Sequence, residues 1–470
     1  MAASPCVWFI TALLPFVGYL IAVFLHAPKQ FDGVRQITTR YLNSVAEKRS
    51  EPKSSDVASV SDRMSPFLMM PEAVGDWKFH SRRKEAPPDP FPVAMETEAQ
   101  VALRQAKSMY ESGRTEKAQR LFQRALQFSP RSADALSAYG EFLHREKEPL
   151  EAEKLLAKAL QVRPDHPDAR RILNMNSAVV EDIDRALFVA VDAKRNSLLK
   201  VPHDDPAFIR AVRENYVRHV YHSNAIEGNT LTLSMVRSIL ETGLAVAGKS
   251  IREHNDVLGL DLALTFVHQS TLKRLELTVE DVIELHQRIM GHSQPLDAGK
   301  FRDTQVFVSK HVPPSPRHLP DLMDKFGQWL VSAEAAAMHP IARAAMDHFK
   351  LVHIHPFVDG NGRLSRLLMN IRLMQGGYPP IIVPVQERYT YYEMLSLADG
   401  GDPRPFIRYV ANLTDRTLEE YLLFTQKQIV ETAVPVVDAE PVAADPTATA
   451  QSAEEPDADV HDQIHHKFHP

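Results

Sequence analysis

The sequence has almost no cysteine, because Cys6 is the single one among 470 residues. No disulfide within the chain can therefore hold the fold, which must rest on a packed core in whatever compartment contains it. Runs in which apolar and polar residues alternate, the pattern of half-buried strands, are also scarce. A composition of 44% hydrophobic and 24% charged residues argues against a disordered, collagenous or all-membrane protein. We expect a mostly α-helical protein of two or three domains.

An excess of one charge is also missing from most of the chain. The formal net charge is −6, but residues 431–470 carry nine acidic side chains against one lysine, a net of −8. The remaining 53 basic and 51 acidic residues nearly balance, so the charge of the whole chain does not identify a partner, and we predict no nucleic-acid partner. Residues 433–470 are poor in aromatics and rich in Ala, Pro and acid, so we predict a disordered acidic tail.

No charged side chain occurs in residues 1–28, where residues 6–25 form an apolar stretch of 20 residues. As a helix this stretch is about 30 Å long, enough to cross a bilayer, so we predict an N-terminal signal-anchor transmembrane helix. A cleavable signal peptide is the alternative, and the missing basic n-region disfavours it. Basic residues after the span favour a cytosolic domain, whereas the glycosylation sequon at Asn412 favours a luminal one. The residues leave the orientation open.

An internal repeat follows a Ser- and Pro-rich linker predicted over residues 29–97. Positions such as Ala118, Ala125 and Pro130 recur 34 residues later as Ala152, Ala159 and Pro164. This period is typical of tetratricopeptide repeats, which we predict at 98–131 and 132–165, with a linker helix at 166–203 to complete their core. An ordinary helical hairpin that happens to repeat is the alternative. Such repeats form a surface for peptides or partner proteins.

Residues 204–432 are again helical by period, except for Thr304 to Val312, whose β-branched and aromatic residues predict a small β-hairpin.

The densest cluster of unusual residues is the loop HPFVDGNGRLSR at residues 355–366, between two helical runs. Gly360 and Gly362 permit positive φ values, so that successive backbone N–H groups converge at a helix N-terminus and form an anion-binding nest. Arg363 and Arg366 lie three residues apart and add forked donors suited to phosphate oxygens.

Two further side chains of this loop suit phosphate chemistry. Asp359 would repel phosphate unless a divalent cation such as Mg²⁺ bound both groups. His355 has the pKa range of a general base. Two other interpretations exist: a glycine-rich helix cap with solvated arginines, and a metal site formed by His353, His355 and Asp359.

The loop resembles the signature HPFxDGNGRxxR of the Fic family, whose metazoan members usually have threonine where Leu364 stands. Fic enzymes transfer AMP from ATP to a protein hydroxyl. The resemblance implies that His355 is the catalytic base, that Asp359 holds Mg²⁺ or Mn²⁺, and that ATP is the co-substrate. The ATP-binding residues that it implies within the loop are Asp359, Gly360, Asn361, Gly362, Arg363, Leu364, Ser365 and Arg366.

Residues 223–228, SNAIEG, look like the family's inhibitory motif. The resemblance implies that Ser223, Glu227 and Gly228 form this motif and that Glu227 pairs with Arg366, which blocks productive ATP binding. The same glutamate can orient a water that removes AMP, so the enzyme would also catalyse de-AMPylation. By itself, Glu227 is an exposed helix glutamate.

The predicted hairpin is similar to the flap that covers nucleotide in Fic proteins. The resemblance places Val308, Ser309, Lys310 and His311 against ATP, and Tyr391, Tyr392 and Asp399 in the nucleotide pocket. Many relatives have asparagine where Asp399 stands, and the two tyrosines have helix packing as an alternative role.

The resemblance covers residues 98–432 in the order of metazoan Fic adenylyltransferases. It implies a single-pass type II protein of the endoplasmic reticulum membrane with a luminal catalytic domain that modifies Thr or Ser of the chaperone BiP. It also implies a homodimer with Ile251 at the contact, although a core isoleucine is the alternative. Two other functions stay open: an inactive tetratricopeptide adaptor, and a Fic-type transferase of another phosphate-containing group.

Overall fold

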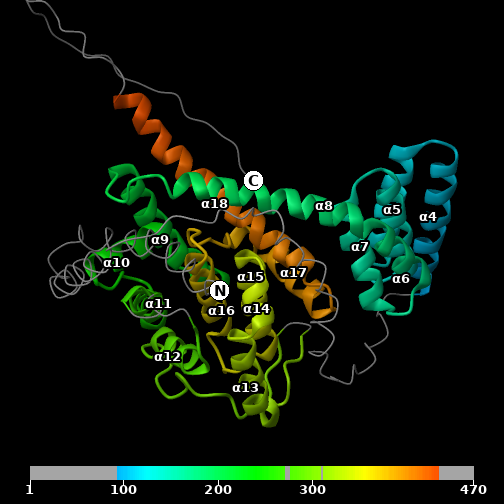
Figure 1. The fold of residues 1–470 in the computed structure, drawn as a ribbon. Helices are drawn as coiled ribbons and strands as arrows, with labels where there is room; N and C mark the ends of the chain where they lie inside the picture. Colours follow the sequence, from blue (N-terminus) through cyan, green and yellow to red (C-terminus); the bar gives the residue numbers. More distant parts are fainter. Residues whose placement is uncertain (1–92, 270–271, 273–275, 309–310, 433–470) are drawn as a thin grey trace, which may run out of the picture. The chain divides into compact units, whose positions relative to one another are not determined.

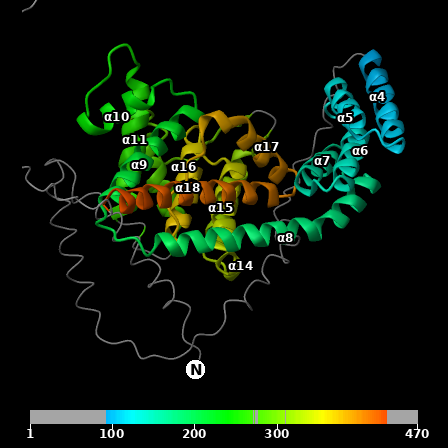
Figure 2. The same cartoon turned by 90° about the horizontal axis from the view of Figure 1, so that it is seen from above.

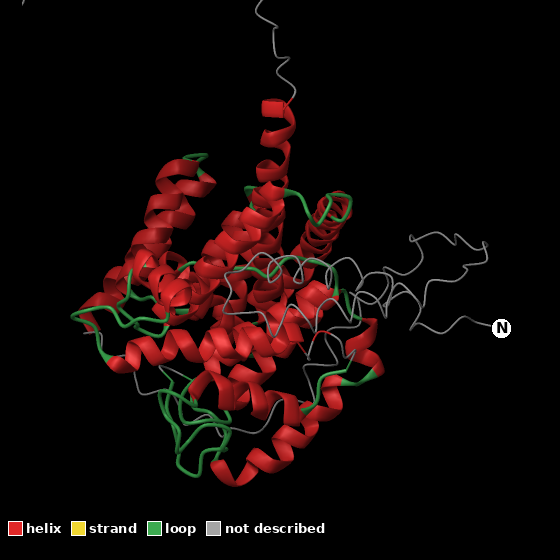
Figure 3. Ribbon diagram, turned by 90° about the vertical axis from the view of Figure 1, so that its left-hand side faces the viewer, coloured by secondary structure: helices red, strands yellow, loops and turns green. Residues whose placement is uncertain are grey.

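The computed structural model describes residues 93–269, 272, 276–308 and 311–432. The predicted membrane anchor, most of the predicted linker, Ser309, Lys310 and the acidic tail lie outside these residues. The described chain is mostly helical, as predicted (Figure 3). Across the described ranges, none of the helices combines the length and apolarity that a membrane span requires.

The first helices form the two predicted antiparallel pairs. They are α4 (Val93–Glu111), α5 (Thr115–Phe128), α6 (Ala133–Arg145) and α7 (Pro149–Val162). Their shared core includes Ala118, Ala125 and Phe122, and Phe122 stacks on Tyr139 at 5.5 Å between ring centroids. A Cβ at Gly140 would lie 2.7 Å from Leu156 Cγ, so α6 and α7 approach closely.

Helix α8 (Pro167–Leu198) connects the repeats to the remaining helices (Figures 1 and 2). Its N-terminal part adds Ala169 and Ile172 to the repeat core, and its C-terminal part adds Phe188 and Leu198 to the second core. The long helix thus completes the repeat module, as predicted.

The second group of helices surrounds the larger core (Figure 1). It consists of α9 (Pro206–Ile226), α10 (Leu233–Thr242), α11 (Ile251–Gln269), α12 (Val279–Met290), α13 (Leu319–Leu330), α14 (Ala333–Ala337), α15 (Pro340–Ile354), α16 (Asn361–Gln375), α17 (Arg388–Asp399) and α18 (Arg404–Thr432), with short 3₁₀ turns at Pro316–His318 and Val385–Glu387. Local signals set several boundaries. Asp205 caps α9 by accepting from Ala207 N at 2.7 Å, and a capping box of Thr278 and Asp281 starts α12.

The central pair of this group is α15 and α16, joined by residues 355–360. Every residue of α16 except Gly362 is buried. Arg372, inside this core, has its charge compensated by Asp347 at 2.7 Å. The loop that joins α15 to α16 is therefore mounted on two rigid, buried helices.

The predicted hairpin is reduced to one antiparallel bridge between Val308 and His311. Val308 N donates to His311 O at 3.1 Å, and His311 N donates to Val308 O at 2.9 Å. No strand occurs in the ranges that the structure describes. Pro313 and Pro314 follow immediately and have no N–H to donate, so the ladder cannot continue in that direction.

Buried ion pairs link the repeats to the second group. Arg408 in α18 pairs with Glu153 in α7 at 2.8 Å and also with Asp184 in α8, and all three side chains are at most 8% exposed. In addition, Lys158 of α7 binds Glu393 of α17. These ion pairs connect the repeats and α8 to α17 and α18.

Candidate active site

The loop between α15 and α16 places His355 at a strained corner. His355 ends α15 with φ 51° and ψ 59°, and it is one of two non-glycine residues with positive φ in the described ranges. Its Nδ1 lies 3.3 Å from Val352 O, and because a carbonyl only accepts, Nδ1 carries the proton. Burial lowers the pKa of His355 to about 4. The imidazole is therefore neutral at physiological pH, with the Nε2 lone pair available.

Three braces, none of which the sequence motifs revealed, hold this loop. The Asn361 amide bonds to both Phe357 N and Phe357 O, at 3.0 and 2.8 Å. The His286 ring stacks on Phe357 at 3.6 Å, and its Nε2 donates to Asp359 O at 2.9 Å. The Asn361 side chain is thus an internal clamp, and Asn361 can offer an anion only its backbone N–H.

The third brace is Arg302, which is 3% exposed. Its Nε donates to His355 O at 2.7 Å, and its Nη atoms donate to Thr304 O at 3.0 Å and Pro314 O at 2.6 Å. One guanidinium thus ties the base of the Val308–His311 segment to the residue that we predict as the catalytic base. Sequence spacing gave no signal for it, because 53 residues separate Arg302 and His355.

The N-terminus of α16 forms the predicted nest. Gly360 has φ 80°, whereas Gly362 lies within α16 without the positive φ that the sequence suggested. Leu364 N is the first to make a helical bond, to Gly360 O at 3.0 Å. The N–H groups of Asn361, Gly362 and Arg363 therefore lack helical partners and suit an anion. The side chains of Leu364 and Ser365 are fully buried, so neither can reach a ligand.

Glu227 lies against the first turn of α16. A Cβ at Gly362 would lie 2.2 Å from Glu227 Oε1, so the carboxylate packs closely against Gly362. The same oxygen accepts from Arg366 Nη2 at 2.7 Å. Buried Arg366 also donates to Ser223 Oγ at 3.1 Å and to Ser223 O at 2.7 Å. The structure thus brings together the predicted inhibitory motif and the predicted phosphate site.

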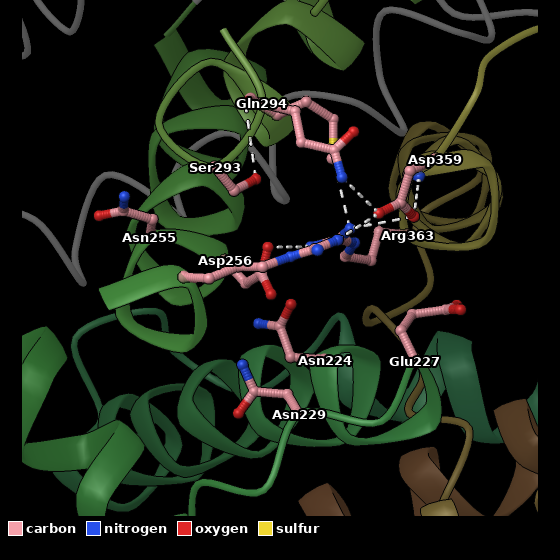
Figure 4. A network of polar contacts seen from close by, with 12 residues as sticks. Asn224, Glu227, Asn229, Asn255, Asp256, Ser293, Gln294, Asp359 and Arg363 are labelled. Atoms are coloured by element: carbon pink, nitrogen blue, oxygen red, sulfur yellow. Dashed lines mark hydrogen bonds and ion pairs between the residues drawn. The ribbon is translucent and has the colours of Figure 1, made fainter. Parts of the chain in front are cut away.

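Asp359 and Arg363 belong to a second polar network (Figure 4). Asp359 Oδ2 accepts from Gln294 Nε2 at 2.9 Å and Arg252 Nη2 at 3.0 Å, and Gly360 N donates to Oδ1 at 2.6 Å. Burial alone would raise the pKa of Asp359, but neighbouring Arg363, Gly360 N–H and Arg252 outweigh it and bring the pKa below its usual value. Asp359 is ionised.

Arg363 is held from its other side by a residue that the sequence did not point to. Its Nη1 pairs with Asp256 Oδ1 at 2.7 Å, and its Nη2 lies 3.5 Å from Asp359 Oδ1 (Figure 4). Its side chain is 3% exposed. The two loop arginines thus have separate carboxylate partners, Asp256 for Arg363 and Glu227 for Arg366.

The remaining predicted site residues lie in different surroundings. Tyr391 is 1% exposed, its hydroxyl lies 2.8 Å from His348 Nε2, and its side chain also interacts with Arg366, so it is a buried residue beside the site. Tyr392 is 40% exposed, with Arg388 over its ring. Asp399 lies 2.7 Å from His353 Nδ1 and 3.3 Å from His311 Nδ1.

Three other predicted residues lie on the surface. Gly228 follows Glu227 with φ 95°, a conformation that favours glycine. Ile251 begins α11 and is 79% exposed, so it is not a core residue. Asn412 is exposed within α18, while Thr414 of its sequon is buried and donates to Val410 O at 2.8 Å.

Comparison with known proteins agrees with this site. The Fic/DOC family matches residues 276–373, and a tetratricopeptide repeat family matches residues 109–175. Proteins called protein adenylyltransferase Fic are 47% identical over 329 residues in Drosophila erecta and in Drosophila virilis. Each match covers 70% of this chain, and the chain spans about two thirds of the relatives' length, 66% and 68% respectively.

A solved structure of Fic-1 from C. elegans has the same fold. It is 37% identical, with a TM-score of 0.66, and the match covers 70% of this chain and 99% of that structure. The sequence of the loop at residues 355–366, the helices that carry it and the similarity to these relatives all indicate the same family. The chain belongs to the Fic/DOC family.

Proposed function

We propose that this protein transfers AMP from ATP to a Thr or Ser hydroxyl of another protein. The observation that carries the proposal is the position of a neutral His355, whose Nδ1 proton is held by Val352 O, beside the nest at the start of α16. A neutral imidazole with a free Nε2 can accept a hydroxyl proton, and the nest can bind the phosphates. The relatives named protein adenylyltransferase support the same reaction.

The proposed reaction is a displacement at the α-phosphorus. The hydroxyl oxygen of the target attacks the α-phosphorus, its proton moves to His355 Nε2, and pyrophosphate leaves with the electron pair of the broken P–O bond. The free N–H groups of Asn361, Gly362 and Arg363 stabilise charge on the phosphate oxygens. The protein's part is positioning and electrostatics, which the rigid mounting of the loop provides.

The residues fit a divalent cation that accompanies ATP. Asp359 is ionised and its side chain is 35% exposed, so its oxygens can bind Mg²⁺ or Mn²⁺ together with phosphate oxygens. Bound there, the ion would neutralise phosphate charge. Arg252 and Gln294 both donate to Asp359 Oδ2 and so orient the carboxylate.

We further propose that Glu227 inhibits this reaction in the same chain. Its carboxylate covers Gly362 and uses Arg366, the groups that a nucleotide phosphate would need. Two anions cannot lie together at this site without a large repulsion. The same carboxylate could orient a water toward AMP on a modified target, so removal of AMP belongs to the proposal.

The proposed target is a luminal chaperone of the BiP type, presented by the tetratricopeptide repeats, with the protein anchored in the endoplasmic reticulum membrane. Ion pairs through Lys158 and Arg408 join the repeats to α17 and α18, which supports a partner bound to the repeats as the target. The exposure of Ile251 is compatible with a homodimer contact.

Labelled ATP tests the reaction. The full chain is incubated with a candidate chaperone and with ATP labelled at the α or the γ position, alongside His355→Ala and Glu227→Gly. We expect α label on the chaperone, absent with His355→Ala and increased with Glu227→Gly. Label from the γ position would indicate transfer of another group, and absence of label even with Glu227→Gly would favour an adaptor.

A further inference from the structure

Four donors among the described residues surround the two carboxylate oxygens of Asp359. Gln294 Nε2 and Arg252 Nη2 donate to Oδ2 at 2.9 and 3.0 Å, and Gly360 N donates to Oδ1 at 2.6 Å. Arg363 Nη2 lies 3.5 Å from Oδ1 (Figure 4). A carboxylate offers about four lone-pair sites, two on each oxygen. A divalent cation can therefore bind Asp359 only where one of these donors withdraws.

Three of the four donors are held in place by other contacts. One is a backbone N–H of the loop itself. The Arg363 side chain is 3% exposed and pairs at 2.7 Å with Asp256, which is 14% exposed. Gln294 is fixed through its backbone, because Gln294 N donates to Met290 O at 2.7 Å. These donors cannot withdraw far without breaking bonds elsewhere.

Arg252 is the donor that can leave. It lies in the first turn of α11, and its side chain is 62% exposed, so it can turn into solvent at low cost. Unlike the neutral Gln294 amide, its guanidinium carries a full positive charge. Arg252 therefore neutralises Asp359, covers one lone pair of Oδ2 and would repel a divalent cation that approaches this oxygen.

We propose that Arg252 competes with the divalent cation for Asp359 Oδ2 and so sets the concentration of Mg²⁺ or Mn²⁺ at which the nucleotide is held. This rests on the proposed function, which takes Asp359 as the ligand of the ion that accompanies ATP. The exchange is non-covalent: the guanidinium turns into solvent, and the ion takes the lone pair that it leaves. Arg252 lies outside residues 355–366 and 223–228, so neither motif assigns it a role.

Calorimetric binding of ADP to the full chain tests this proposal. ADP has phosphates to which an ion can bind but no pyrophosphate to release, so binding is measured without AMP transfer. For each protein, the Kd for ADP in EDTA is divided by the Kd in Mg²⁺, and this quotient is the metal effect. Arg252→Gln is compared with Arg185→Gln, a matched control, because Arg185 forms an exposed ion pair with Asp182 at 2.8 Å in α8.

We expect Arg252→Gln to increase the metal effect about two- to fivefold, the range of an exposed ion pair, and Arg185→Gln to match the unaltered chain. The increase should shrink at high salt, because screening weakens exposed charges. Combining Arg252→Gln with Asp359→Asn should abolish the increase, since the competing groups share this carboxylate. Urea unfolding checks that each variant is folded.

An equal metal effect in Arg252→Gln and the unaltered chain would overturn the proposal and leave the cation role of Asp359 intact. Weaker ADP binding of Arg252→Gln in EDTA and in Mg²⁺ alike would also overturn it, because Arg252 would then hold a phosphate. If ADP binding were independent of Mg²⁺ in every protein, both this proposal and the proposed role of Asp359 would be wrong.

Discussion

The contact between Glu227 and Arg366 leads to a prediction with two effects of opposite sign. Replacing Glu227 with Gln keeps the size of the side chain and removes its charge. Arg366 would lose an ion pair of 2.7 Å but keep its two bonds to Ser223, so it would not be left without partners. We expect Glu227→Gln to lower the free energy of unfolding and to raise the affinity for ATP.

The size of both effects follows from the solvent exposure of the Glu227–Arg366 ion pair. Hydrogen bonds to charged groups contribute about 1.5–3 kcal/mol net. Because the Glu227 side chain is 32% exposed, solvent screening reduces this to about 1–2 kcal/mol. If ATP must displace that contact, its removal strengthens ATP binding by about 5- to 30-fold. The free energy of unfolding should fall by about 1 kcal/mol because part of the lost interaction is recovered by water.

Calorimetric ATP binding, the initial rate with α-labelled ATP and urea unfolding together test this prediction in the full chain. Glu241→Gln is the matched control, because Glu241 is an exposed glutamate on neighbouring α10. The reasoning is refuted if Glu227→Gln and Glu241→Gln bind ATP with the same affinity while only Glu227→Gln loses stability. That result would make the contact structural rather than inhibitory.

Three further predictions concern stability and the brace on the loop. Arg302→Lys cannot reach all three carbonyls, so we expect a loss of about 2 kcal/mol in urea unfolding and a lower kcat with little change in KM for ATP. Asp347→Asn leaves Arg372 buried without a countercharge, so we expect a loss of about 3–5 kcal/mol in urea unfolding. Burial lowers the pKa of His219 to about 4 and of His348 to about 3, whereas the unfolded chain takes up these protons near pH 6.5. The free energy of unfolding should therefore fall as pH decreases from about 6.5 to about 4, by up to about 3 kcal/mol per histidine, measured by urea titrations across that range.

Controls from the surface of the chain accompany these predictions. Arg317→Lys and Asp182→Asn alter exposed charges and should change the free energy of unfolding by less than about 0.5 kcal/mol. If Arg302→Lys changed the free energy of unfolding and kcat no more than Arg317→Lys, the bonds of Arg302 would neither stabilise the loop nor contribute to activity. A free energy of unfolding independent of pH between about 6.5 and 4 would contradict the buried, neutral histidines.

The sequence by itself determined what depends on local spacing. The 34-residue period predicted two helical pairs, and residues 355–366 predicted a nest at the start of a helix, because glycine conformation and helix termini depend on near neighbours. The small hairpin expected at residues 304–312 is not confirmed, since the described residues show one antiparallel bridge and no strand.

Only the tertiary structure decided which distant side chains meet. Arg302, His286 and Asp256 support the loop from positions that no local motif connects to it, and His311, His353 and Asp399 converge from three separate elements. Nor did the sequence show that Tyr391 is buried beside Arg366, because burial of a helical residue depends on what packs against it. Contacts of this kind arise from the packing of helices that are far apart in the chain, and a single sequence carries no periodicity that encodes them.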